Sequence, residues 1–129
     1  MSSPAVDMAT ALQSAGVGTT GVDIFVNVQP TDPDQCITLR DTGSWREPEK
    51  GLDLYYPLVQ ALIRGGPNQF VPTYALAETV RDTILGLSPQ TINLTKYNGF
   101  WCNSDILTLG QDQQRRNLFS VNFRLMRST

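Results

Sequence analysis

The sequence predicts one α+β domain spanning residues 1–129, with a mixed, mostly antiparallel sheet of five to six strands and two helices packed on one face. Two segments carry apolar residues at helical spacing, and about six others are short runs typical of strands. The connections are mostly short, which favours antiparallel neighbours, since parallel neighbours need a long crossover. The order helix, three strands, helix, three strands predicts an α+β domain whose helices cover one face of the sheet.

The first helix is predicted from its start signals. Ser3 followed by Pro4 is typical of an N-cap and a first helical position. A short helix ending at about Ser14 follows from this pattern. The apolar residues at helical spacing within it are Ala5, Met8, Ala9 and Leu12.

Two strands are expected next, in the runs "DIFVNVQ" and "CITLRD". Between them, "PTDPDQ" has the composition of a turn, because Asp32 can bind the backbone two residues ahead and Pro33 fixes φ. The simplest interpretation is a hairpin. Residues 41–57 then show no sustained period, and they are expected to form a long exposed segment.

A central strand is predicted in "LVQALIRGG", with Val59, Ala61 and Ile63 on one face. The second helix has its apolar residues at steps of four and three, with Thr73 as its expected cap and Gly86 as its expected end. These apolar residues are Leu76, Val80, Ile84 and Leu87.

The last third of the chain is predicted to hold three strands. Asn98-Gly99 is a strong hairpin dipeptide, so "QTINLTKYNG" and "FWCNSDILTLG" are expected to pair around it. The final run "LFSVNFRLMR" alternates without a break, which is typical of a strand with one buried face. The residues expected on that buried face are Phe119, Val121, Phe123 and Leu125.

The charge balance argues against several classes of function. Ten basic and twelve acidic residues give a net charge of −2, which does not suggest a protein that grips nucleic acid over its whole surface. No apolar run approaches the length of a membrane span, and the N-terminus lacks the order of a secretion signal, so the protein is expected to stay where it is made. Eight of the ten cations are arginines, which favours directional pairing with carboxylates or partner surfaces.

The stretch "GVGTTG", residues 16–21, has the G-x-G-x-x-G spacing of a dinucleotide-binding loop. Such a loop follows a strand and opens a helix, so that the helix N-terminus meets the phosphates. Here the loop is predicted to follow a helix and open a strand. We therefore expect a flexible connection at residues 16–21 and no bound cofactor.

The chain contains no histidine, which removes the commonest general base and the commonest metal ligand. A small hydrolase that uses Asp32, Asp34 and a bound metal is the remaining enzymatic alternative. Turn positions argue for ordinary loop roles of both carboxylates. We expect a protein that is not an enzyme, without a catalytic residue, metal or cofactor.

Five residues are the candidates for contact with a partner. Trp45, Arg46 and Tyr55 lie in the exposed segment, where aromatic residues either fold back as a lid or face a partner. Arg115 and Arg116 precede the last strand, where they form either a solvated hairpin shoulder near Asp112 or a contact for phosphates or partner carboxylates.

The ordered segments resemble the tail-terminator or minor capsid proteins of long-tailed bacteriophages, over most of the chain from about residue 16. The resemblance rests on a glycine-threonine loop leading into a strand, a proline-aspartate turn, a D-x-G-G-like turn, a strand ending in Arg-Gly, and a G-x-D-x-x-x-R segment. One departure is Ser44, which stands where a second glycine is typical. The matching positions are Thr19 to Phe25, Pro30 to Asp34, Asp41 to Gly43, Arg64-Gly65, and Gly110, Asp112 and Arg115 or Arg116.

This resemblance implies a non-catalytic virion protein that forms a six-fold ring at the head-proximal end of the tail, assembled in the host bacterial cytoplasm. The ring would cap the tail tube, end its polymerisation and offer a surface for the head. The implied partners are further copies of the chain, the tail tube protein and the head-tail connector, without a membrane or sequence-specific nucleic acid. A head-completion or other head-tail joining protein is the alternative within this class.

Overall fold

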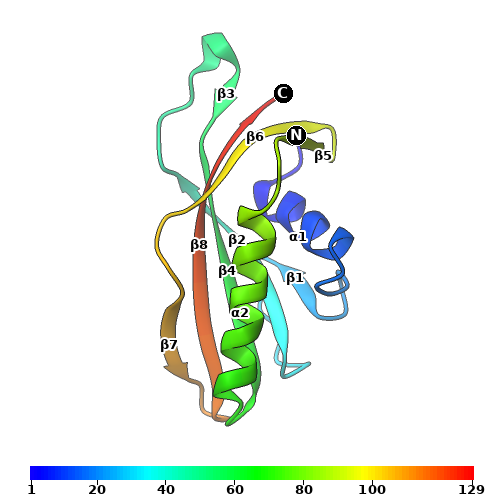
Figure 1. Cartoon of the computed structure of the whole chain (residues 1–129), viewed down its shortest axis with the longest axis vertical. Helices are drawn as coiled ribbons and strands as arrows, with labels where there is room; N and C mark the ends of the chain where they lie inside the picture. Colours follow the sequence, from blue (N-terminus) through cyan, green and yellow to red (C-terminus); the bar gives the residue numbers. More distant parts are fainter.

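The computed structural model describes residues 1–129 and contains two helices and eight strands (Figure 1). The predicted α+β class is confirmed, although two short strands add to the six expected. No helix has the length and apolar character that a membrane crossing requires. The elements are α1 (Pro4–Ser14), β1 (Ile24–Val26), β2 (Cys36–Ser44), the 3-10 helix η1 (Lys50–Leu52), β3 (Leu54–Tyr55), β4 (Pro57–Pro67), α2 (Phe70–Leu85), β5 (Gln90–Ile92), β6 (Thr95–Cys102), β7 (Leu107–Gln111) and β8 (Arg116–Ser128).

The strands form one sheet in the order β1-β2-β4-β8-β6-β5, with β3 and β7 also paired to β8. Every pairing is antiparallel except that of β1 with β2. The long strands β4 and β8 are the centre, because they pair with each other from Leu58 opposite Arg124 to Pro67 opposite Arg116. The predicted mixed, mostly antiparallel sheet is thereby confirmed.

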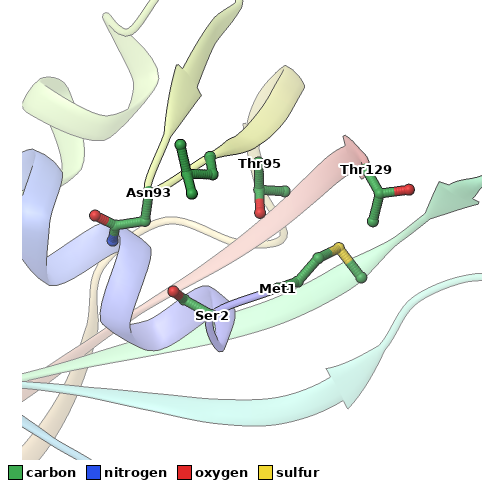
Figure 2. Close-up of a pocket in the computed structure, with 6 residues that line it drawn as sticks. Met1, Ser2, Asn93, Thr95 and Thr129 are labelled. Atoms are coloured by element: carbon green, nitrogen blue, oxygen red, sulfur yellow. The ribbon is translucent and has the colours of Figure 1, made fainter.

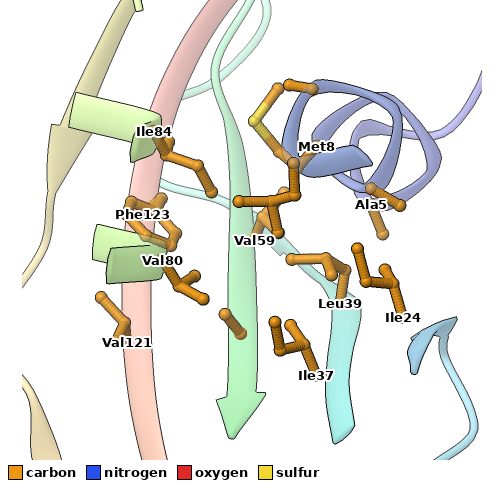
Figure 3. Close-up of a cluster of buried hydrophobic side chains, with 14 of the residues drawn as sticks. Ala5, Met8, Ile24, Ile37, Leu39, Val59, Val80, Ile84, Val121 and Phe123 are labelled. Carbon is orange, nitrogen blue, oxygen red and sulfur yellow. The ribbon is translucent and has the colours of Figure 1, made fainter. Parts of the chain in front are cut away.

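The helices cover one face of this sheet and bury its apolar side chains (Figure 3). The inward residues of β4 and β8 are those predicted from their alternation, and all seven are fully buried. Met8 from α1 and Val80 and Ile84 from α2 point down onto them. The seven strand residues are Val59, Ala61, Ile63, Phe119, Val121, Phe123 and Leu125.

Helix α1 begins and ends where its sequence signals placed it. The Ser3 hydroxyl accepts a hydrogen bond from the Val6 amide, and Pro4 occupies the first turn. A carboxylate from another element adds to this cap, because Asp41 Oδ1 accepts a hydrogen bond of 2.9 Å from the Ala5 amide. The end of β2 and the start of α1 are thus joined by a contact that also satisfies an unpaired amide of the helix.

Helix α2 begins earlier than predicted. Thr73 is not its cap but a buried residue of the first turn, whose hydroxyl donates to the Gln69 carbonyl. A Cβ atom on Gly65 would lie 1.7 Å from the Thr73 hydroxyl, so the glycine in β4 lets α2 approach the sheet closely. The predicted end at Gly86 is confirmed.

The hairpin expected between β1 and β2 is wrong, because the two strands run parallel, with Ile24 opposite Ile37. The turn residues of "PTDPDQ" are present, but the connecting loop returns the chain to the same end of the sheet. The buried guanidinium of Arg64 on β4 holds this loop through the carbonyls of Thr31, Pro33 and Asp34, at 2.7–3.2 Å. Turn composition marks where a chain bends but does not determine the strand direction that follows.

The hairpin expected at Asn98-Gly99 is also wrong. The turn lies at Asn93 and Leu94, whose φ values of 47° and 67° suit a two-residue hairpin between β5 and β6. Asn98 and Gly99 lie within β6, where the pairing with β8 shifts register. A Cβ atom on Gly99 would lie 2.2 Å from the Trp101 ring, so this glycine makes room for an aromatic side chain.

The loop at residues 16–21 follows α1 and precedes β1, as predicted, which is the reverse of the order in a dinucleotide-binding loop. The Thr19 amide donates a hydrogen bond of 2.6 Å to Asp23 Oδ1, and the Thr20 amide donates to Gln13 of α1. The Asp23 carboxylate therefore already binds the Thr19 amide, which a phosphate in this loop would need as a donor. These bonds tie the loop to both flanking elements.

Candidate functional site

The segment from residue 41 to residue 57 is more regular than its sequence indicated. Strand β2 continues to Ser44, which pairs with Pro57, so the segment is the far end of a long β2–β4 hairpin. The short elements η1 and β3 lie in the connection, and β3 pairs with the end of β8. In Figure 1 this connection projects beyond the helices, on the same side of the molecule as the chain termini.

Trp45 folds back against the sheet face that the helices leave uncovered. Its indole Nε1 donates a hydrogen bond of 2.9 Å to the Leu125 carbonyl of β8. The Tyr56 and Trp101 rings pack edge-on to it at centroid distances of 5.1 and 6.2 Å. The Arg124 guanidinium lies over it, 4.9 Å from the ring centre.

These four residues, Trp45, Tyr56, Trp101 and Arg124, are called the aromatic cluster below. Tyr56 is buried, Trp45 and Arg124 are half-buried, and Trp101 is 41% exposed. Arg124 Nε is buried and has no hydrogen-bond partner. Tryptophan, tyrosine and arginine are the residues that most often dominate protein interfaces, and here they gather around the half-buried indole of Trp45.

Arg46 and Tyr55 lie beside the aromatic cluster and differ in exposure. Arg46 is exposed, pairs with Glu49 at 2.6 Å and lies over the Tyr56 ring at 5.0 Å. Tyr55 is half-buried in β3, opposite Arg127 of β8. With Tyr56 it lines a pocket of about 250 Å³ whose wall includes three prolines.

Arg115 and Arg116 are neighbours in sequence but have different environments. Arg115 is exposed at a positive φ of 62°, and its carbonyl accepts a hydrogen bond from the Asn68 amide. Arg116 is 5% exposed and is bound to Asp112 Oδ2 at 2.7 Å, to the Thr31 carbonyl at 2.6 Å and to Asp34 Oδ1 at 3.3 Å. Arg116 therefore joins the 31–34 loop to β8 within the protomer.

Sequence reasoning did not identify a buried polar network between the two ends of the chain. Asp7 of α1 is fully buried, accepts a hydrogen bond from the Tyr97 hydroxyl and pairs with Arg127 at 3.5 Å. The Asn93 amide donates to the other oxygen of Asp7 at 2.8 Å, and Arg127 also donates to the Ser2 carbonyl. The network fixes α1 to the β5–β6 hairpin and to the end of β8.

Tyr97 gives this network a predicted dependence on pH. Burial raises the pKa of the Tyr97 hydroxyl, and its hydrogen bond to Asp7 raises it further. The folded pKa lies above the unfolded value of about 10, so the network stabilises the fold below that pH, and its contribution falls as the pH rises past it. We expect the urea midpoint to decrease as the pH rises above about 10, and to decrease less in Tyr97→Phe. Equal decreases in the two proteins would contradict this assignment.

A pocket of about 460 Å³ lies beside this network, between the N-terminus, the β5–β6 turn and the end of β8 (Figure 2). Its side chains are hydroxyls, an amide and apolar groups, and none of them is ionisable. The side chains of the lining therefore offer mainly neutral polar and apolar contact surface. The lining residues are Met1, Ser2, Asn93, Leu94, Thr95 and Thr129.

The metal-dependent hydrolase considered from the sequence gains no geometric support. Asp34 faces the guanidinium of Arg116, and Asp32 is exposed in the same loop. No three histidine, cysteine, aspartate or glutamate side chains gather where they could hold one metal ion. Asp34 therefore serves the contact between its loop and Arg116.

Comparison with known proteins identifies the family. The chain matches the family model described as "Bacteriophage tail terminator protein" over residues 11–128. No curated protein sequence matches it significantly. A solved structure titled "Virion of native gene transfer agent (GTA) particle" contains a chain with the same fold, with a TM-score of 0.71 at 12% identity. The match covers 98% of this chain and 95% of the other, and at this identity it shows a shared fold alone.

The family model extends from the last turn of α1 to the end of β8 and so includes the whole sheet, α2 and the aromatic cluster. This agrees with the resemblance found in the order of the sequence segments. The chain belongs to the bacteriophage tail terminator family and is a structural protein of the phage tail.

Proposed function

We propose that this protein caps the head-proximal end of the phage tail tube as a ring of identical subunits, six in number. The ring ends polymerisation of the tube protein and presents the surface to which the head-tail connector binds. Assembly takes place in the host bacterial cytoplasm, and the capping role involves no catalysis. The observation that carries this proposal is the match to the tail terminator family over residues 11–128.

A head-completion or joining role is the second candidate, and one experiment separates the two. Particles made without the protein are examined by electron microscopy. Over-long tails are expected if the protein ends tube polymerisation. Tails of normal length that lie detached from heads would contradict termination and favour joining.

A ring requires a heterologous interface, in which one patch of each subunit meets a different patch of the next. We propose that the exposed parts of the candidate residues serve such contacts: Arg46, Tyr55, Arg115 and the outer edge of Trp45. Arg116 is not among them, because its guanidinium is bound inside the protomer. Trp45 also packs within its own subunit, so its removal would affect folding as well as assembly.

A variant with Arg46→Ala and Arg115→Ala tests these contacts. Both side chains are exposed, and surface ion pairs such as Arg46–Glu49 contribute little to stability, so we expect the variant to fold normally. We expect it to join fewer tails to heads in a complementation assay. The matched control is Lys96→Ala, which removes an exposed positive charge from β6. Joining by the double variant at the level of Lys96→Ala would exclude these two arginines as contacts.

A further inference from the structure

Strand β7 presents an open edge of the sheet. It pairs only with β8, and all five of its residues are exposed. Leu107 and Leu109 are 46% and 50% exposed, and the strand contains no charged residue or proline. Natural edge strands are usually protected by charges, prolines or a covering segment, because their unpaired amides and carbonyls attract other strands. Strand β7 lacks charges, prolines and a covering segment within the protomer, and its one irregularity is a bulge between Thr108 and Gly110 in its pairing with β8.

The opposite edge of the sheet, at β1, has a similar composition. Strand β1 pairs with β2 on one side. On its other side, only Ile24 is paired, through an isolated β-bridge with Thr20. The segment from Ile24 to Gln29 is uncharged, and Val22 and Val28 on either side of β1 are 63% and 71% exposed. Figure 1 shows β7 and β1 on opposite flanks of the molecule.

The strand directions make these two edges compatible. Strand β1 is parallel to β2, and two antiparallel steps through β4 lead to β8, so β1 runs in the same direction as β8. Strand β7 is antiparallel to β8 and therefore runs opposite to β1. Rotation about an axis along the strands preserves their directions. In a ring with such an axis, β7 of one copy and β1 of the next would meet as an antiparallel pair, the more favourable ladder.

We propose that neighbouring copies of this chain join edge to edge, with β7 of one copy pairing with β1 of the next. This inference rests on the proposed ring and specifies its subunit contact. The occupant of the β7 edge is a second copy of this chain. Strand β1, on the opposite edge of the same chain, has the direction and the uncharged composition that suit pairing with β7. The contact is heterologous, as ring closure requires, whereas a β7–β7 contact would be two-fold and would stop at a dimer.

The aromatic cluster extends this contact. Trp101 lies on β6 opposite Arg124, and both β6 and β7 pair with the same side of β8. A copy seated on β7 thus approaches the exposed indole of Trp101. Trp45 packs against that indole from within the protomer, and Arg124 lies over the Trp45 ring.

The first test places a charge on each proposed edge. Leu109→Lys and Val28→Lys change exposed side chains, so we expect both variants to fold normally. Circular dichroism and thermal unfolding check this. The matched control is Leu94→Lys, because Leu94 is 95% exposed and lies on neither edge. We expect each edge variant to cap tails at least about tenfold less often than Leu94→Lys, as a buried unpaired charge implies. Capping by both edge variants at the level of the control would overturn the proposal.

The second test detects the pairing by cross-linking. Leu109→Cys and Val28→Cys are combined in a Cys102→Ser background, which removes the half-buried cysteine of β6 and leaves Cys36 buried. Assembled tails are treated with a short bismaleimide. We expect a ladder of covalent multimers from the double variant and single bands from each single-cysteine variant. Dimers from Leu109→Cys alone would show a β7–β7 contact and overturn the proposal.

The cross-linking result also separates this inference from the capping role. Single bands from the double variant in tails of normal length would overturn the edge pairing and leave capping intact. A ladder in tails whose length does not depend on the protein would overturn capping and leave the edge pairing intact.

Discussion

Replacing Asp7 by alanine is expected to lower the free energy of unfolding by about 3–5 kcal/mol, as removal of one partner of a buried ion pair does. Asp7 is fully buried and is the only carboxylate that binds Arg127, Tyr97 and Asn93 together. Without it, the Arg127 guanidinium stays in the interior with its Nε already lacking a partner. The measurement is urea unfolding followed by tryptophan fluorescence.

The matched control for this variant is Tyr97→Phe. It removes one hydroxyl but keeps the ring and the pairing of Asp7 with Arg127, so a loss of only about 1–3 kcal/mol is expected. Because a typical domain is stable by about 5–15 kcal/mol, the loss expected for Asp7→Ala is a large share of the total stability. A loss for Asp7→Ala no greater than that for Tyr97→Phe would show that the ion pair contributes little.

The parts of the fold that sequence predicted correctly depend on local signals. Alternation along β8 and β4 identified seven core residues, and Ser3 with Pro4 placed the start of α1. Both signals report on residues within one element, where side-chain period and capping act directly. This local information was sufficient for the fold class.

The errors in the predicted fold arose where contacts between residues far apart in the sequence determine the local structure. Parallel pairing of β1 with β2 depends on a loop held by Arg64, which lies 30 residues or more from the carbonyls it binds. Asn98-Gly99 has hairpin composition, but Gly99 is needed for the Trp101 ring. The true turn includes Leu94, an apolar residue at positive φ, which turn chemistry does not favour.

The candidate site was predicted in part. The sequence pointed to Trp45, but it gave no indication that Trp101 and Arg124 would lie against it, because they come from β6 and β8. The buried network was missed for the same reason, since Asp7 and Tyr97 are 90 residues apart. One signal was available: Asp7 is the only charged residue in a helix that is otherwise largely apolar.

Arg115 and Arg116 provide the sharpest comparison between sequence and structure, because the sequence treats them as a pair. We expect Arg116→Ala to lower the free energy of unfolding by about 3 kcal/mol, since it leaves the Thr31 carbonyl and the Asp112 carboxylate without their donor and removes a buried side chain. Arg115→Ala is expected to leave stability unchanged within about 0.5 kcal/mol, as exposed positions usually do. Chemical denaturation of both variants measures the difference.

The pKa of Asp112 reports on the same contact independently of unfolding. Burial raises the pKa of this carboxyl, but hydrogen bonds from the Arg116 amide, the Arg116 guanidinium and the Gln114 amide outweigh burial and hold the pKa below its ordinary value. A depressed pKa stabilises the fold above the unfolded value, and this contribution is lost as the pH falls toward the folded pKa. In Arg116→Ala, the Asp112 pKa should rise, and carboxyl NMR titration measures it. An unchanged Asp112 pKa in Arg116→Ala, with the fold intact, would show that the backbone amides alone hold the carboxylate, and the stability loss would then have to come from the 31–34 loop.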